Sequence, residues 1–172
     1  MQVQLSQKEQ MFLEDLKSHE ELCIQKYSKY ANEAECSNLK QIFQTLASHE
    51  QQHYDTINQM IAGQAPSMSQ GQGQQSQGMQ QQGQGMQQQG QGMQGMSGTQ
   101  SQGSKNYSQN DFNMVNDMLS TEKYISGTYD TAIFEFQDKN LRQALNHIQK
   151  EEQEHGEELF NYMKSHGMYN VQ

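Results

Sequence analysis

The sequence predicts an all-α protein: an antiparallel four-helix bundle made of two duplicated helical hairpins joined by a long disordered linker. Three observations predict this fold. Apolar residues recur at alternating spacings of three and four in four segments, which is typical of helices packed in a bundle. The first part of the chain matches the last part after a shift of 102 residues, without a gap. Between them, Gln, Gly, Met and Ser make up almost the whole sequence.

The composition limits the classes of protein to which the chain can belong. Only 32% of its 172 residues are hydrophobic, and these are concentrated near the two ends. A net charge of −9 argues against nucleic acid as a partner. We find no apolar run long enough to span a membrane and no secretion signal, so we expect no membrane contact and synthesis in the cytoplasm without a signal peptide. The two cysteines do not make a disulfide framework, and we expect them to be reduced.

Residues 1–62 are predicted to form the first hairpin. Ser6 and Glu9 have the spacing of a capping box, so the first helix begins there. A short turn at Glu35–Ser37 reverses the chain, and Gly63 ends the second helix. The two stripes comprise Leu13, Leu16, Glu20, Cys23, Tyr27, Tyr30 and Ala34, then Leu39, Ile42, Leu46, Glu50, His53, Ile57 and Met60.

Residues 63–107 are predicted to form an uncharged, disordered linker. A short repeat sets Met79, Met86 and Met93 seven residues apart, which is also the period of a coiled coil. Glycine at two of every seven positions excludes a stable helix, because glycine disfavours helix by about 1 kcal/mol relative to alanine. Two interpretations of the linker stay open. It is either a simple tether or a Gln- and Met-rich surface for assembly.

Residues 108–172 are predicted to form the second hairpin, which completes the same bundle. Ser108, ahead of Asp111, begins its first helix, and a turn at Gln137–Lys139 separates the two helices. The stripes comprise Val115, Met118, Glu122, Ile125, Tyr129, Ala132 and Phe136, then Leu141, Leu145, Ile148, Glu152, His155, Leu159 and Tyr162. An internal duplication of this kind implies two similar units related by a pseudo-twofold axis.

Six positions in these stripes carry ionisable side chains where apolar ones are expected. The motif Glu50-x-x-His53 recurs as Glu152-x-x-His155, and each follows another glutamate by 30 residues. Counted back from the turns at 1.5 Å per residue, each upstream glutamate lies level with its motif. The six are Glu20, Glu50, His53, Glu122, Glu152 and His155.

A pair of divalent metal ions would balance this cluster, because four carboxylates carry four negative charges and buried charge is costly. Carboxylate and imidazole ligands suit iron, manganese or zinc, and the absence of thiolates argues against a structural zinc site. One alternative is a buried salt-bridge cluster without metal, although no Lys or Arg is among the six. Another is a metal-free scaffold in which the glutamates are protonated.

The neighbours of these positions allow two interpretations. Tyr27 and Tyr129 are either ordinary core tyrosines or donors hydrogen-bonded to metal ligands and able to pass electrons. Cys23 is either a small core residue or a redox thiol. The remaining glutamates and histidines near the motifs lie off the stripes, and we expect them to face solvent. They are Glu21, Glu151, Glu154, Glu157, Glu158, His19, His49, His147 and His166.

The six-residue pattern resembles the di-iron ligand set of the ferritin-like superfamily, and Tyr27 resembles the tyrosine near that site in bacterioferritin and rubrerythrin. The stretch MLSTEKYISGTYDTAIFEFQDKNLRQALNHIQKEEQEHGEELFNYMKSHGMY is similar to the coat F domain of spore coat proteins from endospore-forming bacteria. The chain departs from rubrerythrin in having no CxxC pairs, and from ferritin in having no room for a fifth helix.

These resemblances imply a spore coat protein with a structural or protective role and a site for two divalent ions, iron or manganese. Its partners would be other coat proteins or further copies of itself, and its location the spore coat. The alternative is a di-iron or dimanganese oxidoreductase that consumes peroxide or dioxygen. In that enzyme Glu50 and Glu152 would bridge the metals, Glu20 and Glu122 would be terminal ligands, and the histidines would complete the coordination.

Overall fold

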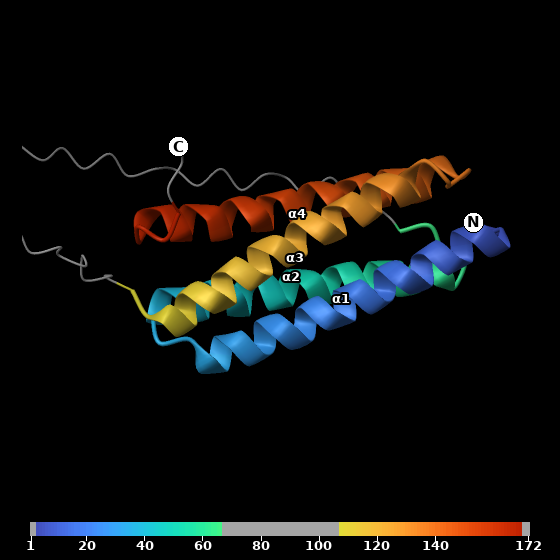
Figure 1. Cartoon of the computed structure of the whole chain (residues 1–172). Coiled ribbons are helices and arrows are strands. Elements are labelled where there is room, and N and C mark those ends of the chain that lie inside the picture. The colour runs from blue at the N-terminus through green and yellow to red at the C-terminus, as the bar shows by residue number, and fades with distance from the viewer. Residues whose placement is uncertain (1–2, 67–106, 170–172) are drawn as a thin grey trace, which may run out of the picture. The chain divides into compact units, whose positions relative to one another are not determined.

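The computed structural model describes residues 3–66 and 107–169, which form four α-helices. These are α1 (Gln7–Glu33), α2 (Ser37–Ile61), α3 (Gln109–Ile133) and α4 (Lys139–Ser165). The helices α1 and α2 pack as one antiparallel hairpin, and α3 and α4 as the other (Figure 1). The helix α1 also packs on α3, and α2 on α4. The predicted four-helix bundle of two hairpins is confirmed.

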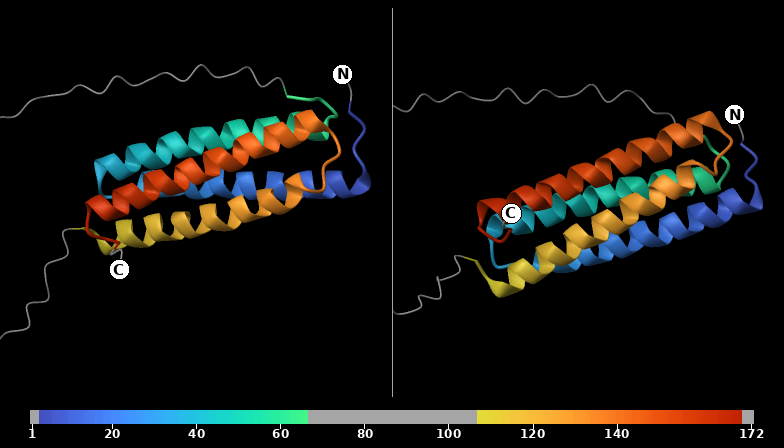
Figure 2. Two further views of the ribbon diagram at one scale, coloured as in Figure 1. Left: turned by 90° about the horizontal axis from the view of Figure 1, so that it is seen from above. Right: turned by 45° about the horizontal axis from the view of Figure 1, so that its top comes forward.

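The two hairpins run in opposite senses along the bundle. The helix α2 ends at the end of the bundle where α1 begins, whereas α3 begins at the opposite end (Figure 2). The helices α2 and α3 therefore point the same way, and each of the neighbouring pairs α1–α3 and α2–α4 is antiparallel. This arrangement places the turn of each hairpin against the first helix of the other hairpin.

Each turn is held by an acidic side chain from the other hairpin. Buried Asp111 in the first turn of α3 accepts hydrogen bonds from the backbone amides of Glu35 and Cys36, at 2.8 and 3.0 Å. Buried Glu9 in the first turn of α1 accepts one from the amide of Gln137, at 2.8 Å. The two acids correspond under the shift of 102 residues, so each hairpin makes the same contact with the turn of the other.

The helix boundaries follow the predicted signals. The capping box of Ser6 and Glu9 is present, and the Ser108 hydroxyl accepts from the amides of Asn110 and Asp111. Gly63 and Gly167 follow α2 and α4 with φ of 74° and 68°. This left-handed conformation at a helix end favours glycine, because it has no side chain to clash.

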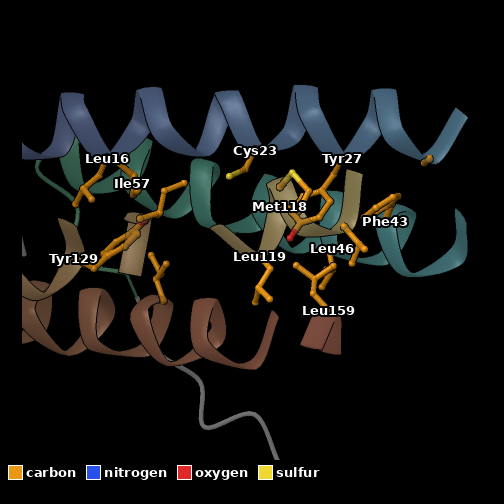
Figure 3. Packing of buried hydrophobic residues seen from close by; sticks show 14 of the residues in the cluster. Leu16, Cys23, Tyr27, Phe43, Leu46, Ile57, Met118, Leu119, Tyr129 and Leu159 are labelled. Carbon is orange, nitrogen blue, oxygen red and sulfur yellow. The ribbon is translucent and has the colours of Figure 1, made fainter. Parts of the chain in front are cut away.

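The core confirms most of the predicted stripes, and Figure 3 shows Tyr27, Met118 and Tyr129 pointing into the interior. Two predicted positions differ. Tyr30 and Ile42 are half-buried, while their neighbours Ala31 and Phe43 are buried. Strict 3-4 spacing departs from the 3.6-residue turn over several turns, so an adjacent residue takes the inward position. The Phe43 ring fills it by packing against Tyr27, with ring centroids 5.8 Å apart.

Three further sequence predictions concern the cysteines, membrane spans and the linker. Both cysteines are free, as expected. No helix in residues 3–66 or 107–169 is long and apolar enough to cross a membrane. The predictions of disorder and of an assembly surface fall largely on residues 67–106, which lie outside the described ranges.

Candidate metal centre

All six predicted ligands come together inside the bundle. Each helix contributes, and no member of the set has more than 3% of its surface exposed. The helix α1 supplies Glu20, α2 supplies Glu50 and His53, α3 supplies Glu122, and α4 supplies Glu152 and His155.

The cluster divides into two overlapping groups that could each hold one ion. Glu20 and His53 belong to the first group, Glu122 and His155 to the second, and Glu50 and Glu152 to both. Within each group, one ligand atom from every residue lies within 4.8 Å of the others. The shared residues are the two glutamates of the duplicated motifs.

The contacts cross from one hairpin to the other. Nδ1 of His53 lies 2.9 Å from Oε1 of Glu152, and Nδ1 of His155 lies 2.9 Å from Oε1 of Glu50. Each imidazole thus turns Nδ1 toward a motif glutamate of the opposite hairpin. The outer nitrogen, Nε2, is left for other partners.

Several polar atoms of the cluster are buried without a well-aligned hydrogen bond, although some of them lie within 2.9 Å of an opposite group, as Nδ1 of His155 and Oε1 of Glu50 do. They are Oε2 of Glu20, Oε1 of Glu50, Oε2 of Glu122, both carboxylate oxygens of Glu152 and Nδ1 of His155. Each buried polar atom left unpaired costs about 1–3 kcal/mol. Oxygen and imidazole nitrogen are suitable donors for iron or manganese, and two divalent cations would engage these atoms together. The residues present therefore fit a dinuclear centre.

Burial raises the pKa of the carboxyl groups, because a carboxylate loses its hydration inside the bundle. The pKa of Glu20 rises to about 7 and that of Glu152 to about 7, although hydrogen bonding to His53 opposes both increases. Burial raises the pKa of Glu50 as well and takes that of Glu122 well above its usual range. Without a cation, the cluster therefore retains protons on groups that are ionised when exposed.

The two predicted tyrosines donate hydrogen bonds to carboxylates of the opposite hairpin. The Tyr27 hydroxyl donates to Oε1 of Glu122, and the Tyr129 hydroxyl donates to Oε1 of Glu20. Burial, and next the charge of the accepting glutamate, raise the pKa of both tyrosines well above the usual range, so both remain donors. Each bond occupies one oxygen of its glutamate and leaves Oε2, the unpartnered atom, for an ion.

Sequence reasoning missed the partners of the outer imidazole nitrogens. Nε2 of His53 lies 3.1 Å from a carboxylate oxygen of Glu151, and Nε2 of His155 lies 3.2 Å from Nδ1 of His49. The expectation that Glu151 faces solvent is met only in part, since its side chain is 37% exposed but contacts His53. His49 is exposed as expected, but its ring stacks on that of His155. One signal could have found both: each directly precedes the glutamate of its motif, at corresponding positions of the duplication.

These partners give the two histidines different pKa values. Burial would lower the pKa of His53, but hydrogen bonds to Glu151 and neighbouring carboxylates raise it well above the usual value. Burial lowers the pKa of His155, and the Glu122 charge opposes this only in part. The half-sites therefore share their ligands but not their surroundings.

Most of the other off-stripe residues face solvent, as predicted. Glu21, Glu154, Glu157, Glu158 and His147 are exposed as predicted, whereas His19 and His166 are half-buried. Cys23 is fully buried, and burial raises the pKa of its thiol, which favours the core role over the redox role.

Comparison with known proteins gives a match to the second hairpin. Residues 110–172 match the Coat F domain family. The chain is also 38% identical over 63 residues to the uncharacterized protein YusN of Bacillus subtilis (strain 168). That alignment covers 37% of this chain and 57% of YusN, a little over half of the relative's length. No solved structure matches the chain. These matches support the coat F family, and the internal duplication relates the first hairpin to the matched one.

Proposed function

We propose that this protein is a spore coat protein of the coat F type whose bundle binds two divalent metal ions. The observation that carries the metal-binding proposal is the convergence of four buried carboxylates and two imidazoles with unpartnered oxygen and nitrogen atoms. The coat F match supports the location, on the spore coat. Its partners would be other coat proteins or further copies of the chain.

Glu50 and Glu152 are the bridging ligands in this proposal, since each belongs to both groups. Glu20 with His53, and Glu122 with His155, are the terminal ligands. The ligand set suits iron or manganese, and the four carboxylates balance the charge of two divalent ions. We also propose a relationship to ferritin-like proteins, which the set of six candidate ligands supports.

A structural or protective role follows from where the ligands come from. Every group draws ligands from both hairpins, so bound metal would tie α1 and α2 to α3 and α4. A metal ion that binds only the folded state stabilises that state, by about 4 kcal/mol when its concentration is a thousand times the dissociation constant. A coat protein strengthened in this way would resist unfolding in a dormant spore.

The oxidoreductase alternative needs turnover in addition to metal. Bound iron or manganese would supply the redox chemistry. This chain's residues would hold the metal and exclude water, and Tyr27 and Tyr129, hydrogen-bonded to Glu122 and Glu20, would be placed to pass electrons. No observation on the described residues favours turnover over binding. Consumption of peroxide by the loaded protein tests this alternative separately.

Metal content tests the proposal directly. The protein is expressed in medium supplemented with iron or manganese, and metals per chain are counted by mass spectrometry beside Glu50→Ala/Glu152→Ala. We expect about two ions per chain in the parent and fewer than one in the variant, which lacks both bridging ligands. The control Glu154→Ala/Glu157→Ala removes two exposed glutamates of α4 and should keep the metal. A metal-free parent protein would refute the site.

Location is tested in a sporulating host. A fluorescent fusion to the C-terminus should collect on the surface of the developing spore, as the Coat F match leads us to expect. A fusion that stays evenly distributed in the mother cell would contradict the coat assignment and leave the metal count unaffected.

A further inference from the structure

We propose that a pocket between α3 and α4 is the entrance through which metal ions and small anionic ligands reach the carboxylate cluster. This inference rests on the proposed metal centre. The pocket has a volume of about 380 Å³, and its lining comes entirely from these two helices. The lining residues are Leu119, Glu122, Lys123, Ser126, Glu152, Gln153, Gly156 and Phe160.

Two of the lining residues belong to the cluster itself. Glu122 and Glu152 are almost completely buried, yet both border the pocket. Oε2 of Glu122 and Oε2 of Glu152 have no hydrogen-bond partner. The pocket therefore ends against two residues whose buried carboxylates can take a cation.

Small side chains open the pocket. Gly156 and Ser126 stand on its two walls, one on each helix. A Cβ atom built at Gly156 would have Cδ1 of Leu119 as its nearest neighbour, at 3.9 Å, which is an ordinary contact. A larger side chain at this position would extend into the pocket.

The first hairpin carries bulky residues at the corresponding positions. Shifted by 102 residues, Gly156 corresponds to Tyr54 and Ser126 to Ile24. Both are half-buried, and the Tyr54 ring lies beneath the ammonium of Lys17, 5.6 Å from the ring centroid. The duplication therefore kept the ligands in both hairpins but placed the small pair, glycine and serine, only in the second.

The size and charge of the pocket indicate what it admits. At roughly 30 Å³ per water molecule, its volume holds on the order of ten waters or one small organic molecule. Its inner end is acidic and attracts metal cations. Once the metals neutralise the carboxylates, the exposed Lys123 favours small anions. Azide and acetate are of suitable size and charge as probes.

The test fills the pocket with the residues of the first hairpin. Gly156→Tyr and Ser126→Ile each copy the corresponding side chain, and the two are made separately so that failure of one to fold leaves the other. The matched control is Gly127→Tyr, the same substitution on α3 at an exposed glycine with no heavy atom within 4 Å of its added Cβ. Uptake of Co²⁺ is followed by stopped-flow absorbance, and azide binding to the Co²⁺-loaded protein by its spectral change.

We expect Gly156→Tyr to slow Co²⁺ uptake by about tenfold and to weaken azide binding, with a smaller effect from Ser126→Ile and none from Gly127→Tyr. The number of metals bound at equilibrium should stay the same in all of them. If Gly156→Tyr or Ser126→Ile folds and leaves both Co²⁺ uptake and azide binding unchanged, the pocket is not the entrance. The proposed metal centre would be unaffected by that result. Absence of metal in the parent protein would overturn both.

Discussion

The two hairpins carry the same candidate metal ligands at the same positions, but they differ in the residues around them. Shifted by 102 residues, the Glu-x-x-His motifs, the upstream glutamates and the two tyrosines coincide. The positions directly before the motifs differ: His49 in α2 and Glu151 in α4. So do the positions directly after them, Tyr54 and Gly156. The duplication preserved the groups that meet at the pseudo-twofold axis and let the outer groups diverge.

Because of this difference, a symmetric set of candidate ligands need not give two equivalent metal positions. Nε2 of His53 meets a carboxylate, whereas Nε2 of His155 meets another imidazole. A carboxylate partner fixes the tautomer of a ligating histidine and makes it a stronger ligand. A neutral partner does this less well, because hydrogen bonds to charged groups are roughly twice as strong. We therefore expect the ion held by His53 to bind more tightly.

The largest effect expected in this comparison is the loss of the carboxylate partner. Glu151→Ala should lower the affinity of the tighter ion by about 10- to 100-fold, the usual range for outer partners of metal ligands. His49→Ala should lower that of the weaker ion by less, since it removes only a neutral, exposed partner. Titration with Co²⁺ followed by absorbance resolves the two binding steps.

Glu154→Ala, at an exposed position of the same helix, controls for the loss of negative charge. Glu151→Gln keeps a hydrogen-bond acceptor without the charge and should fall between the parent and Glu151→Ala. Equal losses for Glu151→Ala and His49→Ala would mean that the two half-sites are equivalent despite their different partners.

An effect of comparable size is expected at the positions where the hairpins agree. Tyr27→Phe and Tyr129→Phe each leave one buried glutamate oxygen unpartnered, which costs about 1–3 kcal/mol. The two variants should therefore lose similar free energies of unfolding, measured by urea denaturation of the metal-free protein. Tyr30→Phe is the control on α1, because its half-buried hydroxyl bonds to Asp117, which Lys26 also contacts. A large loss at one tyrosine alone would show that the reciprocal contacts are unequal.

The sequence predicted the parts of this structure that repeat. Local capping patterns specify the helix starts at Ser6 and Ser108, and apolar periodicity places the six candidate ligands on the inward faces of the helices. The duplication turned two weak Glu-x-x-His motifs into one strong pattern. The duplication also predicted that the two half-sites lie level with each other along the bundle. In both copies, the same number of helical residues separates each candidate ligand from the turn of its hairpin.

What the sequence did not predict depends on how the hairpins pack on each other. Glu151 lies off the α4 stripe, which predicts a side chain that faces solvent, but α2 brings His53 against it. The reach of Asp111 to the turn at Glu35 is likewise a contact between distant segments. Helical periodicity identifies the inward face of each helix, and it does not identify which flanking residues meet at the seam between α2 and α4.

The smallest effect concerns the glycine that distinguishes α4 from α2. Glycine inside a helix costs roughly 0.5–1 kcal/mol relative to alanine, so Gly156→Ala and Gly127→Ala should each stabilise the protein by about that amount. The added methyl at residue 156 meets only Leu119, at 3.9 Å, and should leave most of the pocket open. Equal gains in the free energy of unfolding, measured by urea denaturation, would show that helix packing does not require Gly156. The open pocket would then be the reason for a glycine where the first hairpin has Tyr54. A loss of stability in Gly156→Ala, beside a gain in Gly127→Ala, would instead assign this glycine to close packing of α4 against α3.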